Sequence, residues 1–419
     1  MLSYRGSIPL LIALFAVVCF HIATLTRYPS VFVDEVWLVS RAWAWLQTGS
    51  NFGPLDAGVY DKRLEGYDTF YPIIPTLLVS IFVRYFGLAI EYLRVLPLLL
   101  GFGLLAASYS IAYQLSNSRR CGLIAALLVS MSVSFLISGH MIRYDIIVAA
   151  LGYGAIALAI ASCRRQMAIW SFLSGLMLSA AFEVHMNAAI YGPVLLVVFV
   201  AYERWEIIRS RQFGAFLGGV LIGLAVYIWL HVAPHPDTYF AMGAGMAATH
   251  RPPLFSTIVE SLNSLIESGA YFLEFTAGRI VVALIAAWLA YKARITKTKL
   301  PGYMLLVGFI TFSFLIRNKA FYYMILISPL INIFLAVWIQ GISNGVEPDF
   351  WQKRAKAIAS SILLVSLAVP VYVAFWHAKQ GDWKASGERI KQEIPKAATS
   401  KGKKRELLTP TTFSLIHAT

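Results

Sequence analysis

Charged side chains of this sequence gather where long apolar runs begin or end, and two such places combine residue types that could do chemistry. Asp34 and Glu35 follow the unbroken apolar run 10–20. Arg143-Tyr144-Asp145 lies in a very short connection between two later apolar runs. A carboxylate with a tuned pKa can take a proton from a hydroxyl, and an arginine can neutralise a phosphate. Because ionisable groups at a membrane boundary are costly unless they face a cavity or a partner, we expect these to be functional.

Two further short connections carry polar side chains. His185 and Asn187 lie in a turn between two apolar runs, and Arg317 and Lys319 precede Tyr322 at the start of another run. In a helical bundle these connections would converge on one end. The expected result is a cavity with carboxylates on one wall and cations on another.

The composition predicts an integral membrane protein. Of the 419 residues, 58% are hydrophobic and 13% are charged, whereas soluble domains carry about 25% charged residues. The apolar runs have the length of membrane-crossing helices, which predicts an all-α, polytopic transmembrane bundle. The net charge of +14 is interpreted as a topology signal and not as a nucleic-acid-binding surface. Cys19, Cys121 and Cys163 have no metal-ligand or disulfide spacing.

The apolar runs predict about eleven spans. They cover residues 7–26, 94–115, 121–139, 146–162, 167–183, 187–202, 213–232, 276–291, 300–316, 320–340 and 357–376. The run 71–86 is too short to span and carries Pro72, Pro75 and Arg84, so it is predicted to be an interfacial helix. With that assignment the basic clusters fall on one side of the membrane, as the positive-inside rule requires. These clusters are Arg119-Arg120, Arg164-Arg165, Arg204/Arg209/Arg211, Lys292/Arg294/Lys297/Lys299 and Lys353/Arg354/Lys356.

The predicted organisation is one transmembrane domain, 1–376, followed by a short basic tail, 377–419. The first external loop, 27–93, is expected to hold juxtamembrane helices. The second external loop, 231–275, contains proline turns around Gly243-Ala244-Gly245, so we expect it to be flexible and to close over the site. The N-terminus would be cytoplasmic, and the site would be on the external, periplasmic face of the inner membrane.

Four motifs give the chain a family resemblance. They are Asp34-Glu35 after the first helix, Tyr71-Pro72-x-x-Pro75 in the first loop, Arg143-Tyr144-Asp145, and the basic-aromatic run from Lys319 to Pro329. On these motifs residues 7–340 resemble the C-type (GT-C) polytopic membrane glycosyltransferases. The subgroup that they resemble contains the protein O-mannosyltransferases and the aminoarabinose transferases.

The resemblance implies an inverting transfer of a sugar from a polyprenyl-phosphate donor to a lipid, glycan or protein acceptor. Asp34 would be the catalytic base, with Glu35 in support and Asp145 as a second essential carboxylate. Arg143, Arg317 and Lys319 would hold the donor phosphate. The residues expected to contact the sugar or acceptor are Glu65, Tyr71, His185, Asn187 and Tyr322.

The resemblance implies no cofactor. The first loop lacks an Asp-x-Asp metal motif, so a divalent metal is possible but not implied. His231, His235 and His250 share the second loop without the spacing of a compact zinc site.

Each expected role has a structural alternative. Asp145 beside Arg143 could be a surface salt bridge, His185 and Asn187 a satisfied helix turn, and Arg317 and Lys319 anchors in the headgroups. The competing class is a polytopic transporter or flippase. That class predicts polar or broken segments near the bilayer midplane, whereas the helix interiors here are mostly apolar.

Overall fold

The computed structural model describes residues 7–56, 71–249, 258–275, 279–292, 298–316, 320–343 and 368–373, with single positions at 357, 361 and 364. Within these ranges every regular element is a helix, as predicted for an all-α chain. The longer helices are α1 (Ile8–Thr24), α2 (Val33–Thr48), α3 (Ile73–Phe86), α5 (Val95–Ser116), α6 (Arg119–Ser130), α8 (Tyr144–Arg165), α9 (Ala168–Val184), α10 (Tyr191–Glu203), α11 (Arg211–Tyr227), α12 (Pro236–Thr249), α13 (Ile258–Phe275), α14 (Arg279–Lys292), α15 (Lys299–Leu315) and α16 (Ser328–Ser343). Shorter elements are α4 (Ile90–Leu93), α7 (Val133–Ser138), η3 (Met186–Ile190), η4 (Arg204–Arg209), η5 (Ile228–Val232) and η8 (Phe321–Leu326).

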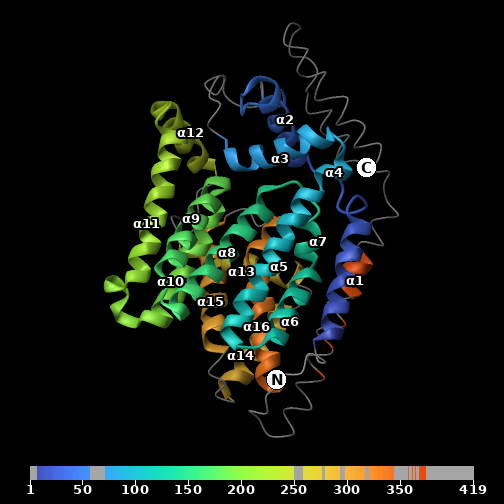
Figure 1. Cartoon of the computed structure of the whole chain (residues 1–419), viewed down its shortest axis with the longest axis vertical. Helices are drawn as coiled ribbons and strands as arrows, with labels where there is room; N and C mark the ends of the chain where they lie inside the picture. Colours follow the sequence, from blue (N-terminus) through green and yellow to red (C-terminus); the bar gives the residue numbers. More distant parts are fainter. Residues whose placement is uncertain are drawn as a thin grey trace.

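Five helical segments of the described residues are long and apolar enough to cross a membrane. They are Ile90–Ser116, Tyr144–Arg165, Met186–Glu203, Arg211–Val232 and Phe321–Gly341. Shorter apolar helices, including Ile8–Thr24 and Lys299–Leu315, run alongside them in the bundle (Figure 1). The predicted polytopic bundle is therefore present, while the number of eleven spans stays a prediction.

The bundle is held by close approaches between neighbouring helices. A Cβ atom on Gly175 of α9 would lie 2.2 Å from the Phe216 carbonyl oxygen of α11, and one on Gly219 would lie 2.2 Å from the Phe172 carbonyl oxygen. Small residues of this kind let apolar helices pack backbone to backbone. Tyr153 of α8 and Tyr191 of α10 are fully buried in the centre of the bundle.

Helices α2 and α3 lie across one end of the bundle instead of along it (Figure 1). This position agrees with the prediction that 71–86 is an interfacial helix and not a span. Glu183, near the C-terminus of α9, accepts hydrogen bonds from the backbone N–H groups of Ile73 and Ile74. Because the first N–H groups of a helix lack partners within it, this carboxylate fixes the start of α3 on the bundle.

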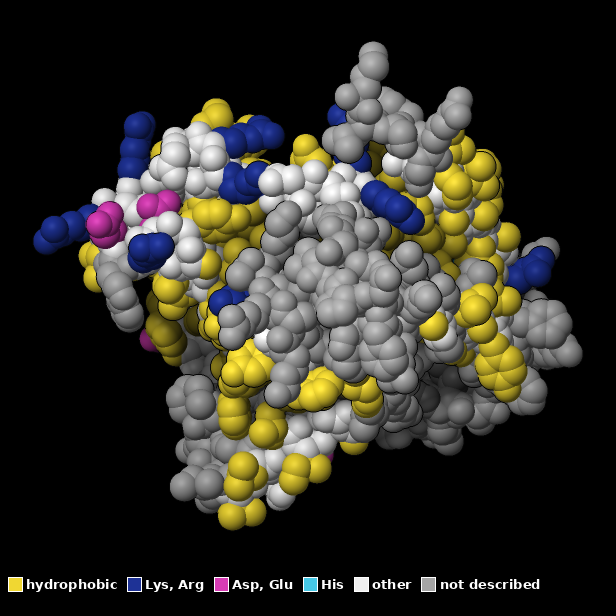
Figure 2. All heavy atoms as spheres, turned by 90° about the horizontal axis from the view of Figure 1, so that it is seen from below, with side chains coloured by type: hydrophobic (Ala, Val, Ile, Leu, Met, Phe, Trp, Pro, Cys, Tyr) yellow, Lys and Arg dark blue, Asp and Glu magenta, His cyan; other side chains and the backbone are white. Residues whose placement is uncertain are grey.

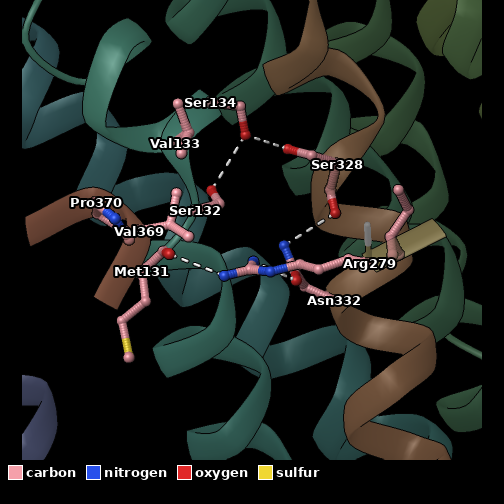
Figure 3. Close-up of a pocket in the computed structure, with 10 residues that line it drawn as sticks. Met131, Ser132, Val133, Ser134, Arg279, Ser328, Asn332, Val369 and Pro370 are labelled. Carbon is pink, nitrogen blue, oxygen red and sulfur yellow. Dashed lines mark hydrogen bonds between the residues drawn. The ribbon is translucent and has the colours of Figure 1, made fainter. Parts of the chain in front are cut away.

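The predicted span 121–139 is wrong as a single helix. Helix α6 ends at Ser130 and α7 begins at Val133, where the Ser132 hydroxyl accepts the N–H of Phe135. Arg279 of α14 satisfies the carbonyl groups released by the break. Its Nη1 donates to the Leu128 carbonyl at 2.9 Å. Its Nη2 donates to the Met131 carbonyl at 2.8 Å (Figure 3).

The same arginine also donates to the side-chain oxygen of Asn332 on α16 at 2.8 Å. It lines a small cavity together with Ser132, Ser134 and Ser328 (Figure 3). The break therefore depends on residues about 150 positions away in the sequence.

The second external loop of the prediction is helical in the part that the structure describes, and its mobility stays a prediction. Residues 236–249 form α12, which runs through Gly243, and residues 258–275 form α13. Helix α13 packs against α15, where the Ser264 hydroxyl donates to the Ser313 carbonyl. A helix anchored in this way is part of the bundle and not a free lid.

The described residues of the basic clusters lie at the end of the bundle opposite α2 and α3. Figure 2 shows this end, where several Lys and Arg side chains lie among apolar ones and fewer acidic side chains are seen. The arginines at the junctions α5–α6, α8–α9 and α10–α11 are exposed there. The distribution is the charge asymmetry that the sequence predicted.

Candidate active site

Four connections meet where α2 and α3 cover the bundle. The first turn of α2 supplies Asp34, the connection from α7 to α8 supplies Arg143, the first turn of α8 supplies Asp145, η3 supplies Asn187, and η8 supplies Tyr322. These elements are brought together because α7 and α8 both pack against η8. The sequence-based expectation that these connections converge at one end agrees with this arrangement.

Arg143 is the centre of the cluster because it contacts two carboxylates from different elements. Its Nε donates to Asp145 Oδ2 at 2.8 Å, and its Nη1 forms an ion pair with Asp34 Oδ2. The Asp145 side chain is 3% exposed and the Asp34 side chain is 33% exposed. The interpretation of Asp145 as a surface salt bridge therefore does not fit, whereas Asp34 is open to a second molecule.

Aromatic rings cover the guanidinium group. Its carbon lies 3.6 Å from the ring centroid of Tyr322 and 5.2 Å from that of Phe32. Burial by itself would lower the pKa of Arg143, but the charge of Asp145 raises it above the ordinary value. The cation is therefore permanent, and cation–π contact adds to its orientation.

His185 and Asn187 flank the same cluster. The backbone N–H of Asn187 donates to His185 Nδ1 at 3.1 Å, which leaves the proton of the neutral ring on Nε2. The His185 ring lies between Tyr144 and Tyr323, with centroid distances of 6.1 and 6.2 Å. Burial lowers the pKa of His185, so the neutral form is favoured.

Glu35 lies beside the cluster but is not placed to act on a substrate. Its side chain is 0% exposed, and Arg94 grips it through Nη2 at 2.7 Å and Nε at 3.1 Å. It also accepts the backbone N–H groups of Phe32 and Ile142 at 2.9 and 3.0 Å. In place of the catalytic support expected from the sequence, we assign Glu35 the role of joining the start of α2 to the loop before Arg143.

Arg94 extends that role to the segment between α1 and α2. Its Nη1 donates to the carbonyl groups of Leu25 and Pro29, and its Nη2 donates to that of Ser30. In the sequence, Arg94 is the first residue of the predicted span 94–115. The available signal was an arginine at the head of a long apolar run, which requires a partner.

A second buried cluster lies under Tyr71. Arg41 of α2 binds Asp56 with two hydrogen bonds of 2.8 and 2.9 Å and donates to the Tyr144 hydroxyl at 2.7 Å. Its guanidinium carbon lies 3.5 Å from the Tyr71 ring centroid. Tyr71, expected to contact the sugar, therefore packs on Arg41, and Arg41 connects α2 to the residue between Arg143 and Asp145.

Three predicted site residues, Glu65, Arg317 and Lys319, lie outside the described residues. Among the residues that are described, no group of three or more His, Cys, Asp or Glu side chains converges as a metal site would require. The described cluster therefore consists of Asp34, Arg143, Asp145, His185, Asn187, Tyr322 and Tyr323.

Comparisons with known proteins assign the chain to a fold class. No protein-family model and no curated protein matches the sequence. The crystal structure of ArnT from Cupriavidus metallidurans bound to undecaprenyl phosphate is similar, with a TM-score of 0.60 at 14% identity, covering 97% of this chain and 82% of that one. The apo structure of the same protein gives a TM-score of 0.56 at 15% identity, covering 94% and 75%.

The cryo-EM structure of arabinosyltransferase EmbB from Mycobacterium smegmatis has a TM-score of 0.56 at 12% identity. It covers 92% of this chain, which spans 39% of the length of EmbB. These proteins are GT-C polytopic membrane glycosyltransferases. The chain therefore has the GT-C fold, and the resemblance seen in the sequence is confirmed at the level of the fold.

Proposed function

We propose that the chain is an inverting membrane glycosyltransferase that takes a sugar from a polyprenyl-phosphate donor. The observation that carries the proposal is the cation of Arg143, held between a buried carboxylate and an accessible one at the end of a GT-C bundle. The ArnT structure with undecaprenyl phosphate supports a lipid-phosphate donor. The proposed acceptor is a lipid, a glycan or a protein.

The proposed reaction divides the work between the two carboxylates. Asp145 holds the Nε edge of Arg143, so the opposite edge of the guanidinium can turn from Asp34 to the donor phosphate. Asp34, released from its ion pair, takes the proton of the acceptor hydroxyl as that oxygen attacks the anomeric carbon. The bond from this carbon to the phosphate oxygen breaks, and the departing phosphate is neutralised by Arg143.

The proposed orientation follows from charge. The site and the exposed basic clusters lie at opposite ends of the bundle (Figures 1 and 2). Since basic residues favour the cytoplasm, we place the site on the external face of the inner membrane, with the N-terminus inside. An acceptor on that face would reach Asp34 without crossing the bilayer.

The experiment is sugar transfer by the purified chain, followed by mass spectrometry of donor and product. We expect Asp34→Asn to lower turnover by about 1000-fold while donor binding persists, because the amide cannot take the proton. Asp237→Asn, at an exposed carboxylate of α12, is the matched control and should keep full activity. Normal turnover by a folded Asp34→Asn variant would contradict the assigned base.

A transporter or flippase is the second candidate, and the break between α6 and α7 favours it. Broken helices with buried polar groups are typical of transport sites, and the sequence had suggested apolar interiors. Against this, Arg279 donates to protein acceptors of α6, its following turn and α16. Movement of a lipid-linked sugar into sealed proteoliposomes without a covalent product would establish this alternative.

A further inference from the structure

Two buried histidines form a continuous hydrogen-bonded chain beside the candidate active site. His21 of α1 is 1% exposed, and His140, in the connection from α7 to α8, is 0% exposed. His21 Nδ1 lies 3.0 Å from His140 Nε2. The two outer nitrogens contact backbone carbonyl groups, His21 Nε2 that of Ser130 at 2.8 Å and His140 Nδ1 that of Tyr28 at 2.9 Å.

The chemistry of these contacts fixes the number of protons. A carbonyl oxygen can only accept, so His21 Nε2 and His140 Nδ1 must each carry a hydrogen. The central contact needs one more hydrogen between the two inner nitrogens. Three protons on four ring nitrogens make one of the two rings an imidazolium. If both rings were neutral with these outer bonds, two lone pairs would face each other at 3.0 Å.

The groups around the pair have opposite effects on its protonation. Burial lowers the pKa of His140, and the nearby charges of His21 and Arg94 act in the same direction, while the Tyr28 carbonyl opposes them. The charge of Arg94 is itself matched by Glu35. Arg279 binds the Met131 carbonyl, next to the Ser130 carbonyl that His21 binds, and as a like charge it also disfavours an imidazolium. The C-terminus of α6, which these carbonyl groups close, favours positive charge.

The pair is connected to Arg143 through two intervening residues of the chain, Met141 and Ile142. His140 ties the connection to Tyr28, Ile142 is held by Glu35, and the Arg143 N–H donates to the Met141 carbonyl at 2.9 Å. In the backbone of residues 139–143, the histidine pair and Glu35 are thus two separate anchors. Loss of either anchor would loosen Arg143, which contacts both Asp34 and Asp145.

We propose that His21 and His140 are positioning residues that share one proton, and that this shared proton holds the 139–143 connection, and with it Arg143, in its active position. The effect of the pair on catalysis rests on the proposed role of Arg143. The shared proton itself does not depend on that role. When the proton is lost as pH rises, the two rings repel, and Arg143 shifts relative to Asp34. A displacement of about 1 Å at such a group can cost roughly 100-fold in rate.

Two glutamine variants distinguish the shared proton from simple packing. In His140→Gln, the amide N–H can donate to a neutral His21, so the central bond forms without a charge. In His21→Gln, the amide donates to Ser130 and its oxygen accepts from His140, which must still carry two protons. The first variant should therefore lose the pH dependence, and the second should keep it.

The direct test is nitrogen NMR of the full chain labelled with ¹⁵N-histidine, with the two variants as assignments and His235→Gln, at an exposed histidine, as control. We expect His21 and His140 to titrate as one unit that gains a single proton, with a coupling across the central bond. Independent titrations without that coupling, or a pair that stays neutral between about pH 5 and pH 9, would overturn the proposal. Either result leaves the glycosyltransferase proposal intact.

The functional test is the pH profile of sugar transfer. We expect kcat of the wild type to fall by roughly 10- to 100-fold as pH rises through the midpoint measured by NMR. His140→Gln should lack this step, and His21→Gln should retain it. Identical profiles for the wild type and His140→Gln would show that the pair does not position Arg143.

Discussion

Arg143 is held by two carboxylates from different elements, and these two carboxylates differ in their exposure to solvent. The buried Asp145 fixes one edge of the guanidinium, and the partly exposed Asp34 pairs with the other. The sequence predicted that these residues, with His185, Asn187 and Tyr322, lie together, because their connections had to share one end of a bundle. It did not predict that Glu35 and Tyr71 would be held by Arg94 and Arg41, since those pairings join positions far apart in the chain.

Replacing Arg143 with lysine tests this grip. Lysine keeps the charge but has no planar fork, so it cannot contact Asp145 and a second anion along two edges. We expect Arg143→Lys to lower kcat by about 100-fold with a smaller change in donor affinity. Turnover and donor binding are measured separately, and Arg120→Lys at the exposed basic end is the control. Unchanged kcat would remove Arg143 from the reaction.

His185 predicts a pH dependence of stability. Because burial lowers its pKa in the folded chain, the unfolded chain takes up the proton first as pH falls below about 6.5. The stability that the neutral ring contributes is thus present above that pH and is lost as pH falls through the folded-state pKa. We expect the difference in unfolding temperature between the wild type and His185→Gln to shrink over this range. A difference that is constant with pH would contradict the buried neutral ring.

At the scale of elements, the apolar runs of the sequence predicted most helix positions, and the length and charge of 71–86 predicted that α3 would not run along the bundle as a span. The break between α6 and α7 was not predictable from its own residues, because the run 121–139 is apolar throughout most of its length. Side chains of α1 and α14 stabilise the break, because His21 and Arg279 satisfy the carbonyl groups of Ser130, Leu128 and Met131. The helical course of 258–275 was missed for the same reason, since its packing against α15 is a tertiary effect.

Removal of Arg279 should therefore destabilise the bundle without touching the site. Arg279→Gln leaves buried carbonyl groups of α6 without donors, and each such group costs about 1–3 kcal/mol. We expect a lower unfolding temperature with the rate per folded molecule nearly unchanged, measured by thermal unfolding in detergent against Arg120→Gln. A stable variant that has lost its activity would instead indicate a functional cavity around Ser132 and Ser328.

At the scale of the whole molecule, the fold, the position of the cluster and the charge asymmetry agree with one another. The exposed basic residues and the cluster around Arg143 lie at opposite ends of the bundle, and α2 and α3 cover the cluster (Figure 1). A site at one end suits an enzyme whose donor phosphate lies at headgroup depth, whereas a transporter needs a path through the bundle. The central claim is thus covalent transfer at one membrane face.

The most direct measurement is made on purified protein in sealed proteoliposomes with a labelled polyprenyl-phosphate sugar and a membrane extract as the source of acceptor. Product and lipid phosphate are counted together by mass spectrometry. We predict one polyprenyl phosphate released for each sugar transferred, with inverted anomeric configuration and loss of both signals in Asp34→Asn. Sugar that crosses the bilayer still attached to its lipid, with no covalent product, would contradict this account.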